Sequence, residues 1–133
     1  MSYVATLTTD AGSAENPTWP DAELKILALD SRTFTIVILA PLTKALPDNN
    51  SSHMAIGGGA NDSVIVYITD DNLRFWNPID PSRSDFDSKI SVLIGGQIGE
   101  YRASQFVSRK LALLAARQYF DDGTRAPNLV WSE

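Results

Sequence analysis

The chain has 133 residues, of which 44% are hydrophobic and 20% are charged, and it contains no cysteine. This length is typical of a single domain, here residues 1–133, that buries one core. The absence of cysteine excludes disulfides, thiolate catalysis and cysteine-ligated zinc. With 16 acidic and 11 basic residues, the formal net charge is −5. This charge disfavours direct binding to nucleic acid, which depends on neutralising phosphates.

The chain shows no sign of insertion into a membrane. No stretch reaches the run of about 18 apolar residues that a membrane span needs. Residues 1–6 lack the basic cluster and apolar run that begin a signal peptide. We therefore expect a cytoplasmic protein. Its negative charge fits a protein that attracts a basic partner, and it also fits a protein whose charge only maintains solubility.

A segment predicted to be rich in turns, residues 10–18, precedes the first predicted helix, residues 19–29. Thr18 stands three residues before Asp21, which is the spacing of a capping box. Asp30 follows the last helical position. The apolar face of this helix is predicted to comprise Leu24, Leu27 and Ala28.

Apolar, β-branched and aromatic runs predict a series of strands. The predicted strands are residues 1–8, 33–39, 54–57, 63–68, 73–76, 89–94 and the terminal aromatic segment 129–131. The sequence Asp70-Asp71-Asn72 predicts a hairpin turn. Gly95-Gly96 is expected to end the predicted strand 89–94. Residues 44–52 and 77–88 are predicted to be polar loops.

The second predicted helix is longer and covers residues 106–120. Ser104 is its predicted N-cap, and Gly123 suits the left-handed position after the helix. Two adjacent apolar rows give this helix a wide buried arc. The rows are Val107, Leu111, Leu114 and Ala115, and Phe106, Leu113 and Phe120. Mostly consecutive strands with a helix near either end predict an α+β fold, with an antiparallel sheet of about five to six strands covered by both helices.

The residue types that carry catalysis form no recognisable set. His53 is the only histidine, so a metal site with two histidines is excluded, and as a general base His53 would need an orienting carboxylate. The run Gly57-Gly58-Gly59 lacks the Gly-Lys-Ser/Thr ending of a phosphate loop. The calcium-loop spacing of aspartates is also absent. We expect no catalytic residue, no metal and no cofactor.

Acidic residues gather near Phe75 and Trp76. An exposed aromatic anchor inside an acidic rim is suited to a basic cleft on a protein partner, although Trp76 equally fits a place in the core. The predicted partner-binding residues are Asp70, Asp71, Arg74, Trp76, Asp80, Asp85 and Asp87.

The C-terminal part of the chain carries several short motifs. They are Gly95-Gly96, residues 115–120 ending at Phe120, Gly123-x-Arg125-x-Pro127, and Val130-Trp131. Together they resemble the signature of the immunity protein 1 family of bacterial polymorphic toxin systems. The resemblance extends over residues 54–133 and is weak over the first 50 residues. Ala126 separates Arg125 from Pro127, where the family usually has Arg-Pro directly.

The resemblance implies a cytoplasmic antidote that binds its toxin one to one and occludes the toxin's active site, the toxin often being a nucleic-acid (cytosine) deaminase. It implies that Gly95, Gly96, Phe120, Arg125, Pro127 and Trp131 determine the fold, and we expect the contacts in polar loops instead. Two alternatives stay open. One is an effector chaperone or adaptor of a secretion system. The other is a small hydrolase in which Asp80, Asp85 or Asp87 meets His53.

Overall fold

The computed structural model describes residues 2–41, 52–83 and 88–133. Its main element is a six-stranded antiparallel sheet in the order β2-β1-β3-β4-β5-β9. Two small antiparallel sheets pair β6 with β10 and β7 with β8. The strands of the main sheet are β1 Thr6–Thr9, β2 Gly12–Glu15, β3 Ile36–Ala40, β4 His53–Gly58, β5 Ser63–Thr69 and β9 Val107–Ser108. The others are β6 Asn77–Ile79, β7 Lys89–Ile94, β8 Gln97–Arg102 and β10 Val130–Ser132.

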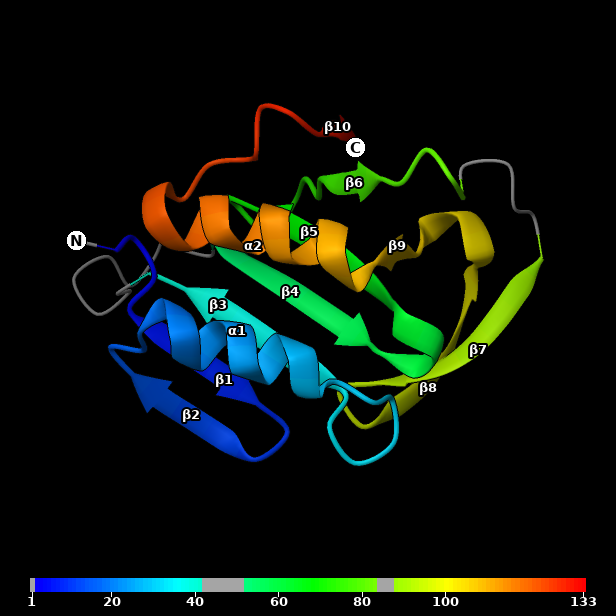
Figure 1. Ribbon diagram of the computed structural model, residues 1–133, viewed down its shortest axis with the longest axis horizontal. Coiled ribbons are helices and arrows are strands. Elements are labelled where there is room, and N and C mark those ends of the chain that lie inside the picture. Colours follow the sequence, from blue (N-terminus) through cyan, green and yellow to red (C-terminus); the bar gives the residue numbers. More distant parts are fainter. Residues whose placement is uncertain (1, 42–51, 84–87) are drawn as a thin grey trace.

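The two helices, α1 Trp19–Ala28 and α2 Arg109–Asp122, lie on the same face of the main sheet (Figure 1). The predicted capping box begins α1, because the Thr18 hydroxyl accepts the Asp21 N–H and the Asp21 carboxylate accepts the Thr18 N–H. Gly123 ends α2 with a φ of 75°, as predicted. The α+β class, the antiparallel sheet and the positions of both helices are therefore confirmed.

The main core fills the space between the helices and the sheet. Alternate residues of β5 point into it, as the period of a strand requires. They are Val64, Val66 and Ile68, all fully buried. From α2 come Ala112, Ala115, Ala116, Tyr119 and Phe120. Small alanines on this face allow the helix to approach the sheet closely.

A second, smaller core lies on the opposite face, where the β7–β8 hairpin packs against the sheet. Its buried residues are Ile65, Val92 and Phe106. Gly57 of β4 faces this hairpin, and a Cβ placed there would lie 2.5 Å from Ile94 Cγ2. Side chains from the hairpin therefore occupy the volume that a larger residue at position 57 would need.

The helix faces and one helix start differ from the sequence predictions. In α1 the buried residues are Ala22 and Ile26, whereas Leu24 and Leu27 are 64% and 52% exposed. The N-cap of α2 is Ser108, whose hydroxyl accepts the Leu111 N–H at 3.2 Å. Ser104, the predicted N-cap, instead lies in a short 3-10 turn, Ala103–Gln105. Leu114 of α2, predicted to be buried, is exposed.

Several strand predictions also need correction. Residues 12–15, predicted to be a turn, form the edge strand β2. Residues 73–76 form no strand, because only Trp76 pairs with β5, through an isolated bridge to Ile68. The predicted loop 77–88 begins with β6, and β8 was not predicted at all. The predicted loop 44–52 lies almost wholly outside the described residues. Among the helices described, none has the length and apolar character needed to cross a membrane.

Candidate functional site

A tight loop between β5 and β6, residues 70–76, is held by hydrogen bonds within itself and to Thr69, the last residue of β5. The Thr69 hydroxyl donates to the Arg74 carbonyl at 2.6 Å and accepts the Asn72 N–H at 2.9 Å. One Asp71 carboxylate oxygen accepts the backbone N–H groups of Leu73 and Arg74 at 2.8 and 2.9 Å. These backbone hydrogen bonds hold the pKa of Asp71 below its ordinary value, and the one from Arg74 has the larger effect.

The 70–76 loop projects a large apolar side chain into solvent. Leu73 is 81% exposed, while Trp76 is half-buried. A pocket of about 470 Å³ opens here, lined by Asp70, Asp71, Leu73, Arg74, Trp76 and Arg125. A smaller pocket of about 210 Å³ adjoins it and is lined by Ile68, Asp70, Gly123, Thr124 and Arg125. We call these two together the loop pocket.

The loop pocket brings together charges of both signs. The Arg125 guanidinium lies 4.1 Å above the centre of the Trp76 ring. Arg74 makes an exposed ion pair with Glu133 at 3.6 Å. The structure thus gathers four predicted binding residues, Asp70, Asp71, Arg74 and Trp76, in one place. It also adds Arg125, which we had predicted to be a fold determinant.

Asp80 lies elsewhere and is buried, with only 6% of its surface exposed. Its carboxylate accepts the Ser82 N–H and hydroxyl at 3.0 and 2.6 Å, and the Ser108 N–H at 3.0 Å. Arg83 makes a longer ion pair with it at 3.8 Å. Burial raises the pKa of Asp80, but these hydrogen bonds and the nearby arginine together bring it below its ordinary value. The Asp80 carboxylate therefore makes its contacts within the fold and does not belong to the loop pocket. Asp85 and Asp87 lie outside the described residues.

Apart from Pro127, the remaining signature residues lie in a turn or make contacts within the fold. Gly95 and Gly96 form the β7–β8 turn with φ values of 61° and 81°. Phe120 is buried edge-on against Trp19, with ring centres 5.6 Å apart. The Trp131 indole donates to the Ala126 carbonyl at 3.0 Å. Pro127 is exposed.

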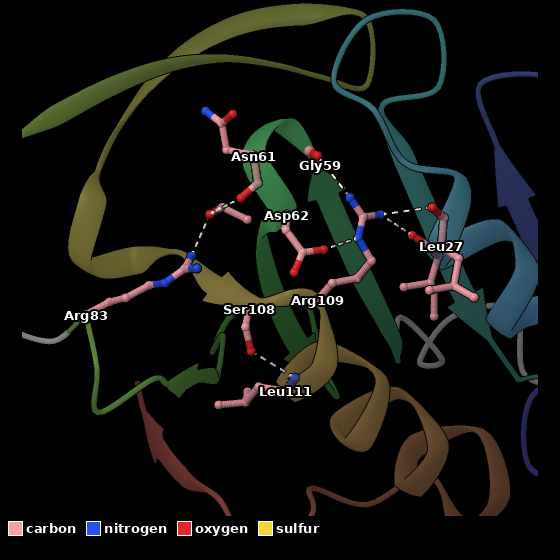
Figure 2. Close-up of polar contacts among 10 residues, drawn as sticks. Leu27, Gly59, Asn61, Asp62, Arg83, Ser108, Arg109 and Leu111 are labelled. Carbon is pink, nitrogen blue, oxygen red and sulfur yellow. Dashed lines mark hydrogen bonds and ion pairs between the residues drawn. The ribbon is translucent and has the colours of Figure 1, made fainter.

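Arg109, at the start of α2, makes a polar network that the sequence analysis did not find (Figure 2). Its guanidinium donates to Asp62 at 2.9 Å, to the Gly59 carbonyl at 2.9 Å and to the Ile26 carbonyl at 2.7 Å. It thereby joins the end of α1 to the turn before β5. A basic residue in the first turn of a helix is unfavourable for the helix dipole, and this was the available sequence signal.

His53 does not meet Asp80. Its Nε2 lies 3.0 Å from the Tyr67 hydroxyl, and His53 pairs with Thr69 at one end of β5. Asp80 contacts Ser108, which pairs with Ser63 at the other end, about 20 Å away at the rise of a strand. Within the described ranges, no group of three His, Asp or Glu side chains is placed to hold a metal ion.

The loop pocket combines an exposed apolar side chain, Leu73, with charged side chains of both signs. No protein-family model matches the chain. A search of curated proteins finds no match to it either.

Proposed function

We propose that this chain is an immunity protein, which binds a cognate bacterial toxin through the 70–76 loop and so occludes the toxin's active site. The observation that carries the proposal is the exposure of Leu73 on a loop held by four hydrogen bonds. A single exposed leucine is ordinary on a protein surface. Here it lines a pocket together with a half-buried tryptophan and four charged side chains, which suits an apolar anchor with a polar rim.

The charges on the loop support a toxin that acts on nucleic acid. Asp70 and Asp71 are both exposed beside Leu73. An enzyme that acts on nucleic acid needs a basic surface where the phosphates lie. Two exposed carboxylates and a net charge of −5 would speed the encounter with such a surface. The resemblance to the immunity protein 1 family supports the same kind of partner.

Co-expression with the toxin domain encoded beside this chain tests the proposal. We expect the chain to rescue the cells, to co-purify with the toxin in a one-to-one complex, and to abolish its activity in vitro. If rescue and co-purification both fail, the proposal is wrong. A stable complex in which the toxin keeps its full activity would instead identify an effector chaperone.

Charge reversal tests whether the 70–76 loop is the interface. The double variant Asp70→Lys/Asp71→Lys should weaken toxin binding by at least about tenfold, as should Leu73→Ala. Asp121→Lys/Asp122→Lys is the matched control, because it reverses two adjacent exposed aspartates that do not line the loop pocket. If both double variants bind with equal affinity, the interface lies elsewhere.

A further inference from the structure

The loop pocket contains an exposed arginine, Arg125. Among the described residues, Arg125 donates no hydrogen bond and makes no ion pair, and its guanidinium lies 4.1 Å above the Trp76 ring. A cation–π contact is not a hydrogen bond, so the N–H groups of the guanidinium stay available for an acceptor. This geometry suits bidentate binding of a carboxylate.

Arg117 offers a direct comparison within the same chain. It also lies over a tryptophan, 5.2 Å from the centre of the Trp19 ring. Its Nε, however, donates to Asp121 at 3.0 Å. Arg74 of the loop pocket is likewise engaged, with Glu133. Within residues 2–41, 52–83 and 88–133, Arg125 thus differs from these two arginines in having no carboxylate partner.

An opposite charge stands close to Arg125 without pairing with it. Asp70 and Arg125 both line the larger and the smaller pocket, yet no nitrogen–oxygen distance between them falls within 4.0 Å. In the part of the chain that the structure describes, Asp70 makes no ion pair of its own. The larger pocket, of about 470 Å³, has room for one side chain from a partner.

Resting on the function proposed above, we propose that the loop pocket receives an aspartate or glutamate side chain of the toxin, whose carboxylate binds Arg125 beside Trp76. The partner's surface then carries an acidic residue next to the basic residues that face Asp70 and Asp71. The class of ligand follows from the charges that line the site. Asp70 and Asp71 repel any anion, but they repel a phosphodiester chain or a doubly charged phosphate more strongly than a single carboxylate. One carboxylate also matches the charge of the Arg125 guanidinium.

Binding measurements on the purified complex with the adjacent-gene toxin domain test this inference. Arg125→Gln should weaken binding by at least about tenfold and Arg125→Lys by less, because lysine keeps the charge but loses the planar fork. The matched control Arg117→Gln should bind within about twofold of the unaltered chain, since Arg117 does not line the pocket. Circular dichroism should show that all three variants stay folded.

A double-mutant cycle identifies the partner group. Each exposed Asp or Glu of the toxin is changed to its amide, and one of these changes should cost affinity against the unaltered chain but almost none against Arg125→Gln. Inorganic phosphate should compete no better than chloride at equal ionic strength. If Arg125→Gln binds normally while Asp70→Lys/Asp71→Lys does not, or if no toxin carboxylate couples to Arg125, this inference fails and the proposed function stands. Selective competition by phosphate also contradicts it. Absence of any complex with the unaltered chain overturns both.

Discussion

The carboxylate of Asp80 accepts the backbone N–H of Ser108 at 3.0 Å, and so the segment after β6 is tied to the residue that caps α2. Asp80 was predicted to bind a partner, but this contact shows that its carboxylate stabilises the fold. Loss of the carboxylate leaves the partly buried N–H and hydroxyl donors of Ser82 and the N–H of Ser108 without their partner. An unsatisfied buried polar group is costly.

We predict that Asp80→Ala lowers the free energy of unfolding by about 1–3 kcal/mol. Asp70→Ala, which removes an exposed carboxylate, should change it by less than about 0.5 kcal/mol. Urea unfolding followed by tryptophan fluorescence measures both values. Equal stability of the two variants would show that the Asp80 contacts contribute little.

Arg109 and Asp62 form an ion pair in which we expect the arginine to contribute more to stability than the aspartate (Figure 2). Asp62 is exposed, whereas the arginine also serves the carbonyls of Ile26 and Gly59. Arg109→Met should therefore destabilise the chain by about 2–4 kcal/mol, and Asp62→Asn by less than about 1 kcal/mol. The comparison of the two urea midpoints checks this. Similar losses would mean that the ion pair, and not the carbonyl contacts, stabilises the junction.

Two glycines with positive φ allow the cost of a steric clash to be measured separately from the cost of backbone strain when alanine replaces glycine. Gly59 has a φ of 115°, and a Cβ there would lie 2.8 Å from the backbone nitrogen of Asp30 and against the Leu29 carbonyl. Gly12 has a φ of 129° with nothing within 4 Å of the same position. Gly12→Ala should cost about 1 kcal/mol through strain alone, and Gly59→Ala at least about 2 kcal/mol more. Differential scanning calorimetry of both variants would refute this if their melting temperatures agreed.

Asp30 should make stability depend on pH in the acid range. Backbone hydrogen bonds from Phe34 and Arg32 lower its pKa from 3.8 to about 2. Because the unfolded chain binds this proton more readily, the stabilisation is complete above about pH 4 and is lost as the pH falls toward 2. Asp30→Asn should therefore lose less stability than the unaltered chain between these values. Thermal unfolding at several pH values measures the slopes, and identical slopes would contradict the assignment.

Local signals were sufficient for the helix ends that depend on neighbouring residues. The Thr18–Asp21 capping box and the glycine at position 123 are encoded within a few positions, so both were predicted correctly. The buried face of α1 was not, because Ala22 and Ile26 share helical spacing just as Leu24 and Leu27 do. Contact with the sheet selects between the two faces, and that choice depends on residues far along the chain.

Short strands formed by distant partners left no local pattern. β6 contains Pro78 and pairs only with β10 among the described strands, with Trp131 opposite Pro78. A three-residue segment that contains a proline has the sequence pattern of a loop. It forms a strand here because the C-terminal segment pairs with it. The same holds for the loop pocket. The acidic loop was predicted from neighbouring residues, whereas the stack of Arg125 on Trp76 joins segments that only the fold brings together.

The hydrogen bonds of the 70–76 loop have a consequence for how a complex would form. Thr69 and Asp71 already fix the backbone around Leu73 in the free chain. Docking then requires little ordering of this segment, and the conformational entropy that flexible loops lose on association is largely spent during folding. The loop is thus expected to bind as a rigid body, with the same backbone before and after association.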